Sequence, residues 1–145
     1  MSDIRIQEYS SFDALQPLRP AWDAVARSGG YGPAQSFDWL ATVWDVNRAG
    51  RELLVLAAHD EAGLAGVVPL VYEKQQRKGV TARVIRMLGS FHSLHGTPFL
   101  LGLHSQEVMA AAFDHLRARN GSWTLWFNAY QVGDPQEDLF FAALR

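Results

Sequence analysis

Residues 52–72 read ELLVLAAHDEAGLAGVVPLVY, and this stretch decides the fold class. Two apolar runs flank the turn-forming residues 60–63, which is the pattern of a β-hairpin. Pro69 has no N–H to donate to a strand ladder, so we expect a bulge or a free edge there. After a polar, basic connection at 73–79, the run TARVIRML at 81–88 predicts a third strand. The centre of the chain is therefore predicted to be a three-stranded meander.

Helices and further strands are predicted on both sides of this meander. The alternating run 4–9 predicts a first strand. Two helices follow it, the first capped by the hydroxyls of Ser10 or Ser11 and the second capped by Ser36. The remaining elements are a short strand at 99–101, a helix capped by Ser105, a buried-type strand at 123–127 and a helix from the capping-box residues 134–137. The pattern is that of a single α/β domain over residues 1–145.

Composition excludes several classes of function. The chain has 145 residues, 48% of them hydrophobic, and a formal net charge of -2. Its basic residues cluster only at Lys74, Arg77 and Lys78, which gives no electrostatic case for nucleic acid or an anionic membrane surface. The absence of cysteine excludes disulfides and thiolate sites. No apolar run approaches the roughly 18 residues of a membrane span, so we expect a cytoplasmic location and no membrane span.

The aromatic residues predict a core and a further contact surface. Trp22, Trp39 and Trp44 lie on apolar helical stripes and are expected to be buried. Trp126 belongs to a strand that we expect to be covered on both faces or to meet a second domain. Neighbouring helical residues such as Phe140 and Phe141 cannot share one core stripe, so one of them is expected to contact another part of the protein. The last helix has no terminating signal, which favours a chain that continues past its final residue.

Four strings resemble the GNAT acyltransferases, and within them the CelD/BcsL branch, which is associated with cellulose biosynthesis. They are LRPAWD at 18–23, QSFDWL at 35–40, LAGVVPL at 64–70 and VIRMLG at 84–89. The resemblance covers residues 12–145. It implies a GNAT-like α/β (α+β) fold, with a mixed, mostly antiparallel central sheet flanked by helices and with central strands that splay to admit an acyl-CoA.

The resemblance also implies partners. Proteins of that branch contain two GNAT-like halves, and this chain matches the N-terminal half. The implied reaction is transfer of an acyl group from acetyl-CoA to an amine or hydroxyl of a small-molecule or polysaccharide-pathway acceptor. A second function remains open, that of a non-catalytic GNAT-like domain for binding or scaffolding.

The family's loop for the CoA pyrophosphate, [QR]-x-x-G-x-[GA] before a helix, is matched incompletely. The corresponding residues 86–91 read RMLGSF, so Arg86 and Gly89 are the candidate cofactor ligands. Phe91 stands where a small residue lets phosphate approach the backbone. No helix is predicted for more than a dozen residues afterwards. A strand end with a turn glycine is the favoured interpretation, and a complete loop is expected in the second half.

The segment GSFHSLHGTP at 89–98 is the candidate acceptor surface, because loops at the carboxyl ends of strands commonly carry function. His92 or His95 is a candidate general base, since imidazole titrates near neutrality. Ser90 and Ser93 are the candidate substrate-facing residues. The commoner alternative for both histidines is a solvated loop side chain. No metal site is expected, because zinc requires three or four ligands and only His104 could join this pair.

Overall fold

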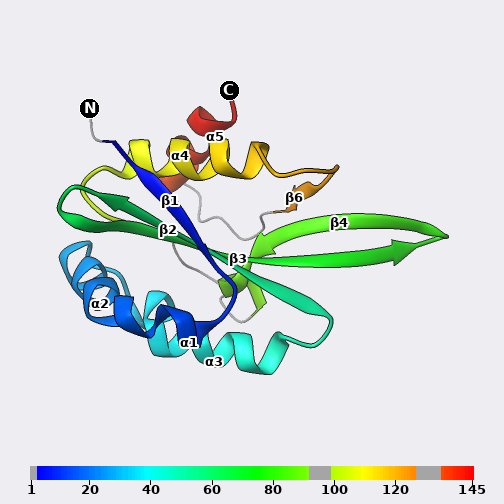
Figure 1. Cartoon of the computed structure of the whole chain (residues 1–145), viewed down its shortest axis with the longest axis horizontal. Helices are drawn as coiled ribbons and strands as arrows, with labels where there is room; N and C mark the ends of the chain where they lie inside the picture. The colour runs from blue at the N-terminus through cyan, green and yellow to red at the C-terminus, as the bar shows by residue number, and fades with distance from the viewer. Residues whose placement is uncertain (1–2, 92–98, 127–134) are drawn as a thin grey trace.

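The computed structural model describes residues 3–91, 99–126 and 135–145 and contains a twisted sheet with helices on both faces (Figure 1). The strand order is β1-β2-β3-β4-β6, and β5 also pairs with β3. The strands are β1 (Arg5–Tyr9), β2 (Arg51–Asp60), β3 (Gly63–Arg77), β4 (Val80–Met87), β5 (Leu100–Leu101) and β6 (Thr124–Trp126). The α-helices are α1 (Phe12–Leu15), α2 (Arg19–Ser28), α3 (Phe37–Asn47), α4 (Ser105–Arg117) and α5 (Pro135–Leu144). Short 3-10 turns are η1 (Gln16–Leu18), η2 (Pro33–Gln35) and η3 (Leu88–Phe91).

The central meander is formed by two tight hairpins. β2 and β3 pair antiparallel from Asp60↔Gly63 to Arg51↔Glu73. The turn between β3 and β4 contains only Lys78 and Gly79, which both have positive φ, 50° and 80°. Such turns match the right-handed twist of the strands that they join. The predicted three-stranded meander is therefore confirmed.

The prediction of a basic connection at 73–79 is wrong. These residues continue β3 as far as Arg77 and pair with β4, from Glu73↔Val84 to Arg77↔Val80. Their polar side chains carry no strand pattern, because beyond Glu73, which is buried, the β3–β4 ribbon projects past the helical layers (Figure 1). Backbone pairing and the two-residue turn stabilise this ribbon. Its strands therefore form without the alternation of apolar and polar residues that marks a strand in the sequence.

The sheet changes partner at Pro69. Along one edge of β3, β4 pairs from Leu70 to Arg77, whereas β5 pairs at Gly66 and Val67. Pro69 lies between these two partners, so the expected free edge is present at this position. The irregularity in the β2–β3 ladder lies elsewhere, between Ala58 and His59.

Gly66 allows β5 and α4 to lie close to β3. A Cβ atom at this position would lie 2.9 Å from the carbonyl oxygen of Leu100 and 2.9 Å from a methyl carbon of Val108. Either distance is shorter than carbon atoms tolerate. A glycine is therefore required at this position so that β5 and α4 can pack against β3.

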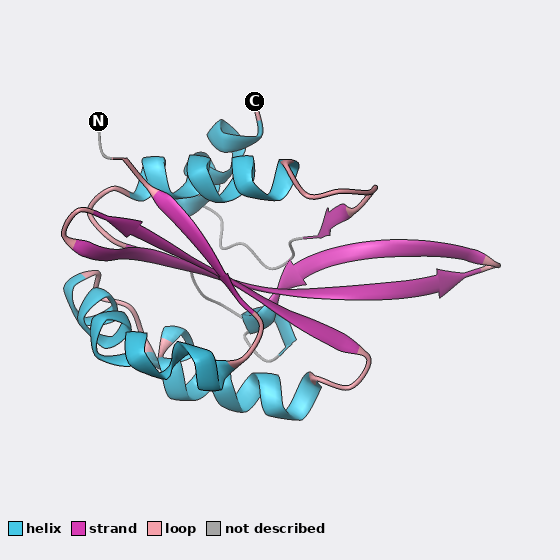
Figure 2. Cartoon of the chain, in the orientation of Figure 1, coloured by secondary structure: helices cyan, strands magenta, loops and turns pink. Residues whose placement is uncertain are grey.

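Each face of the sheet packs against its own helical layer (Figure 2). On one face, α1–α3 cover a core that includes Trp22 and Phe37, whose rings meet edge to face at 5.3 Å. On the other face, α4 and α5 cover a core in which Phe113 and Phe140 make the corresponding contact at 5.4 Å. The sheet is thus the middle layer of a three-layer sandwich.

Two predicted helix caps are confirmed, whereas a third cap and two burial predictions are wrong. The hydroxyl oxygen of Ser11 accepts a hydrogen bond from the N–H of Ala14, and that of Ser36 accepts one from Trp39, each at 3.2 Å. Ser105 is the first residue of α4 and does not cap it, because the N-cap is His104, which makes no side-chain capping hydrogen bond.

The predicted buried-type strand at 123–127 is described as far as Trp126, and Thr124 and Trp126 of β6 are exposed. Trp39, predicted to be buried, is 40% exposed. It follows Phe37 by two positions, and about 200° of helical rotation turns it away from the core.

Within the described residues, no helix has both the length and the apolar character needed to cross a membrane.

Candidate functional site

β4 and β6 form the only parallel pair among the described strands. Val84 lies opposite Thr124, and Arg86 lies opposite Trp126. Their carboxyl ends therefore point the same way, and the chain leaves both strands at one edge of the sheet. Ligand sites in α/β domains form preferentially outside the carboxyl ends of parallel strands. This edge is the candidate functional site.

The structure places part of the predicted acceptor loop at this edge. Gly89 and the backbone of Ser90 belong to η3, which directly follows β4 and packs against α3. Leu88 is fully buried in the core beneath α1–α3 and anchors this turn. The side chain of Ser90 and the whole of His92, Ser93 and His95 lie outside the described residues, so their proposed roles stay predictions.

Arg86 is engaged by its neighbours. One guanidinium nitrogen lies 3.3 Å from a carboxylate oxygen of Glu73, and the guanidinium carbon lies 5.3 Å from the centroid of the Trp126 ring. The arginine side chain is 17% exposed, whereas Trp126 is 43% exposed. A planar cation over an indole face is a favourable electrostatic contact. Arg86 thus links β3 to the parallel pair.

Glu73 is the centre of a charge cluster that spans three strands. Its carboxylate accepts hydrogen bonds from Arg51 and from the amide of Gln75, both at 2.7 Å, in addition to the contact with Arg86. Burial alone would raise the pKa of Glu73, but the hydrogen bonds from Gln75, Arg51 and Arg86 outweigh it and hold this pKa below its ordinary value. Glu73 is therefore ionised at neutral pH and acts as a structural anion.

The outward edge of β5 is closed by two side chains. The Tyr31 hydroxyl donates a hydrogen bond to the carbonyl oxygen of Leu101 and accepts one from its N–H, both at 2.9 Å. The Gln136 amide accepts from the N–H of Phe99 at 3.2 Å and donates to its carbonyl oxygen at 2.8 Å. These contacts satisfy four backbone groups that would otherwise be open to another strand.

Tyr31 and Gln136 also contact each other, because the amide nitrogen of Gln136 lies 3.3 Å from the tyrosine hydroxyl. Tyr31 follows α2, and Gln136 lies in the first turn of α5, so the contact joins the two helical layers at the end of the sheet. Neither residue was predicted from the sequence. Their partners are remote in the chain, and no local pattern marks them.

The described residues do not form a complete site for the pyrophosphate of CoA. η3 has four residues and is too short to provide the anion site of a helix N-terminus. Arg86 is bound to Glu73, and the backbone edge of β5 is already satisfied. No group of three histidine, aspartate or glutamate side chains suited to a metal ion occurs within the described residues.

Comparisons with known proteins identify the fold. No protein-family model matches the chain, and no curated protein matches it by sequence. A solved structure that matches is the ribosomal-protein-alanine N-acetyltransferase from Brucella melitensis biovar Abortus 2308, with a TM-score of 0.50 and 15% identity. The match covers 98% of this chain and 89% of that chain. Identity this low shows the fold alone, and it confirms the predicted GNAT-like fold with a mixed, mostly antiparallel sheet flanked by helices.

Proposed function

We propose that this chain is the N-terminal half of an acyl-CoA-dependent N- or O-acyltransferase of the CelD/BcsL type. In this proposal it supports the fold and shapes the acceptor side, while a second GNAT-like half holds acetyl-CoA. The observation that carries the proposal is the likeness to an N-acetyltransferase over 98% of the chain. The incomplete pyrophosphate site of the described residues supports the division of roles between two halves.

The contribution of this half is positioning. Holding an acceptor in the correct orientation supplies much of the rate advantage of an enzyme. The edge at β4 and β6 would form the surface on which the acceptor lies, because the Arg86 side chain there is held by Glu73 and lies over Trp126. His92 or His95 would take the proton that the acceptor loses, and Ser90 and Ser93 would face the acceptor.

Calorimetric titration of acetyl-CoA tests the division of roles. We expect no micromolar binding to the 145-residue chain and clear binding to a longer protein that includes a second half. Micromolar binding to this chain alone would contradict the proposed division. An Arg86→Gln variant then shows whether the loop at 86–91 is the site, with Arg77→Gln as a control at the far end of the β3–β4 ribbon.

Replacement of the two histidines tests the acceptor side. His92→Ala or His95→Ala in the full-length protein is expected to lower kcat by about 100-fold or more and to change its pH profile, as for loss of a general base. His115→Ala is the matched control, because His115 pairs with Glu8 at 2.8 Å between α4 and β1. Unchanged turnover in both loop variants removes these residues from the site.

A non-catalytic binding or scaffolding domain is the second candidate. The observation that favours it is the internal engagement of both Arg86 and the β5 edge, which leaves few free donors for a cofactor among the described residues. The two candidates differ in one measurement. If the longer protein neither binds acetyl-CoA nor transfers an acetyl group to amines or hydroxyls, the scaffolding function is supported.

A further inference from the structure

The β3–β4 ribbon has an open backbone edge on β3 beyond Glu73. β2 pairs with β3 only as far as Arg51↔Glu73, so residues 74–77 pair with β4 alone among the described strands. The turn before β2 leaves space beside this edge, because a Cβ atom at Gly50 would meet no atom within 4 Å. Figure 1 shows the ribbon extending past both helical layers. The outward N–H and carbonyl groups of residues 74–77 are therefore open to an added strand.

The ribbon also carries an unbalanced positive charge. Residues 74–83 contain the basic residues Lys74, Arg77, Lys78 and Arg83 and no acidic residue. All four side chains are exposed, and none of them forms an ion pair within the described part of the chain. The other 9 of the chain's 13 basic residues stand against 15 acidic residues, which leaves a formal net charge of -6 outside the ribbon. The ribbon is thus a basic projection from an acidic body.

Two of these cations lie side by side on one face of the ribbon. Lys74 is directly opposite Arg83 in the β3–β4 ladder, and like charges in this position repel each other. Glu52, an exposed residue of the neighbouring strand, forms no ion pair with either of them within the described ranges. Arg77 projects to the other face, because it follows Lys74 by three positions. An anionic strand at the edge of β3 would therefore meet a cation on each face and reduce the repulsion.

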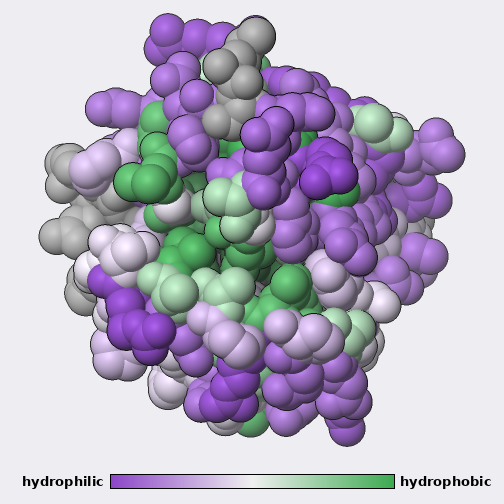
Figure 3. Space-filling model, turned by 60° about the vertical axis from the view of Figure 1, so that its left-hand side comes forward, coloured by the Kyte–Doolittle hydropathy of each residue, from purple (hydrophilic) through white to green (hydrophobic). Residues whose placement is uncertain are grey.

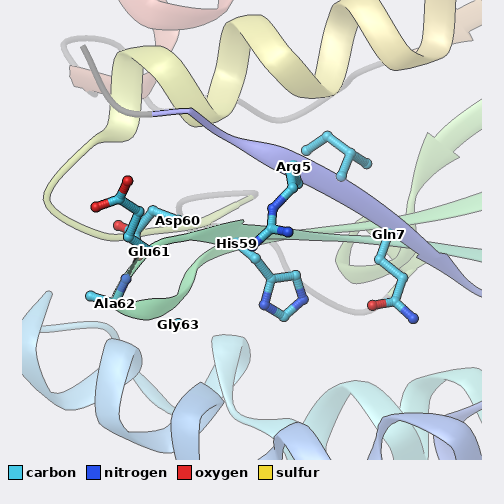
Figure 4. Close-up of a pocket in the computed structure, with 8 residues that line it drawn as sticks. Arg5, Gln7, His59, Asp60, Glu61, Ala62 and Gly63 are labelled. Atoms are coloured by element: carbon cyan, nitrogen blue, oxygen red, sulfur yellow. Dashed lines mark hydrogen bonds between the residues drawn. The ribbon is translucent and has the colours of Figure 1, made fainter.

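The opposite end of the sheet lacks this one-sided charge. The hollow between β1 and the β2–β3 turn is lined by Arg5 but also by Asp60 and Glu61 (Figure 4). Figure 3 views that side of the molecule, where hydrophobic side chains gather in the middle of the face between more polar regions. An anionic partner is therefore favoured at the ribbon and not at that end.

The open edge and the charge together specify the kind of partner. A strand that is added to a sheet edge gains affinity from main-chain hydrogen bonds and specificity from its side chains. A nucleic acid would use the cations but not the backbone edge, and the negative charge of the rest of the chain would repel a long polyanion. A second copy of the ribbon would bring basic side chains together, which disfavours self-pairing. An extended acidic peptide satisfies both the edge and the charge.

We propose that an extended acidic segment of another protein adds as a strand to the open edge of β3 at residues 74–77. Lys74 and Arg77 pair with its carboxylates on opposite faces, and Lys78 and Arg83 raise the local positive potential. The ribbon lies at the amino end of β4, whereas the candidate functional site lies outside its carboxyl end. The proposal therefore does not depend on the proposed acyltransferase function.

Nuclear magnetic resonance of the isotopically labelled full chain tests the proposal. The probe is a short, end-capped peptide of Glu-Glu-Thr-Thr repeats, which as a strand presents glutamates on both faces. We expect saturable shifts centred on the backbone amides of residues 74–77, with a dissociation constant of about 1 mM or tighter. A Gln-Gln-Thr-Thr peptide lacks the charge, and a Glu-Glu-Pro-Pro peptide keeps the charge but cannot complete a strand ladder. Each is expected to bind more weakly by about tenfold or more.

Variants separate this edge from general charge attraction. Lys74→Gln combined with Arg77→Gln is expected to weaken binding of the glutamate–threonine peptide by about tenfold or more, because both faces lose their cation. Arg5→Gln combined with Arg27→Gln is the matched control, since it changes the net charge equally at exposed residues outside the ribbon. Binding to the control variant should be unchanged. Equal weakening by the two double variants would contradict a site on the ribbon.

Other outcomes would also overturn the proposal. These are the absence of a saturable response at residues 74–77 and equal binding of the proline-containing peptide. Tighter binding of a short DNA duplex than of the acidic peptide would assign the ribbon to nucleic acid instead. Shifts of the same amides with protein concentration alone would show that the edge pairs with a second copy of the chain.

Discussion

Glu73 shows how one buried charge can hold several strands together. It lies on β3 and receives donors from β2 and β4, and its side chain is only 7% exposed. A buried pair of opposite charges adds little over an apolar pair, but removal of one partner leaves the other charge poorly solvated. The cluster of Arg51, Glu73 and Arg86 should therefore respond strongly to loss of its single anion.

We expect Glu73→Gln to lower the free energy of unfolding by about 1–3 kcal/mol at pH 7, because both arginines lose their carboxylate and solvent can replace it only in part. Urea denaturation measures this difference. Glu52→Gln is the matched control, because Glu52 is an exposed neighbour on β2 without a side-chain partner in the described part of the chain.

The same variant has a defined pH dependence. The pKa of Glu73 is lowered in the folded state, so its stabilisation is fully present above the unfolded pKa and is lost as pH falls through the folded pKa. The stability difference between the wild type and Glu73→Gln should hold at neutral pH and shrink in acid. A difference that stays constant down to strongly acidic pH would contradict the assignment of Glu73 as a structural anion.

At the scale of elements, β5 is the most dependent on side chains. It has two residues and pairs with β3 at only two positions. Its outer edge depends on Tyr31 and Gln136, which replace a neighbouring strand. The attachment of β5 to the sheet is therefore set by contacts between the two helical layers.

We expect Tyr31→Phe to destabilise the chain by about 1–3 kcal/mol, because the N–H and carbonyl groups of Leu101 lose their partner. Amide exchange at Leu101 should accelerate more than at residues in the middle of β3. Tyr9→Phe is the control, since the hydroxyl of Tyr9 makes no hydrogen bond within the described ranges. Equal effects of the two replacements would show that the β5 edge is not held in this way.

The elements that the sequence predicted are those with local signals. Ser11 and Ser36 lie directly before their helices, and the turn at 60–63 joins two apolar runs. Neighbouring residues in the sequence were therefore sufficient to predict these two caps and this hairpin. Residues 73–77 were missed because their polar side chains carry no burial pattern. Tyr31 and Gln136 were missed because each acts on β5 across a long stretch of chain. The catalytic roles of His92 and His95 remain predictions. The local sequence supports them, and both residues lie outside the described part of the chain.

At the scale of the whole molecule, α5 presents a divided surface. Phe140 is buried against Phe113, whereas its neighbour Phe141 is 50% exposed. This arrangement follows the helical geometry expected from the sequence, in which the two rings cannot share one face. Contact of Phe141 with a second half of the protein remains a prediction of the proposed function.

We expect the strands of the sheet to differ in their protection from hydrogen exchange. β3 lies at the centre of the sheet and pairs with β2 and β4 through tight turns, whereas β1 and β6 lie at its two ends. Backbone amides of β3 that bond to β2 should exchange most slowly, and those of β1 and β6 should exchange faster. Mass spectrometry of peptides from each strand measures this order. Equal protection of β1 and β3 would contradict it.

The two-residue turn at Lys78 and Gly79 also has a consequence for the order of events during synthesis. β2, β3 and β4 are neighbours in the chain, so this meander can form as soon as it leaves the ribosome. β6 reaches β4 only after the whole of α4 has been made. In that interval the outer edge of β4 has no partner strand, and an unpaired edge can recruit a strand from another nascent chain. The rate of elongation through α4 therefore sets how long this chain is exposed to misassembly.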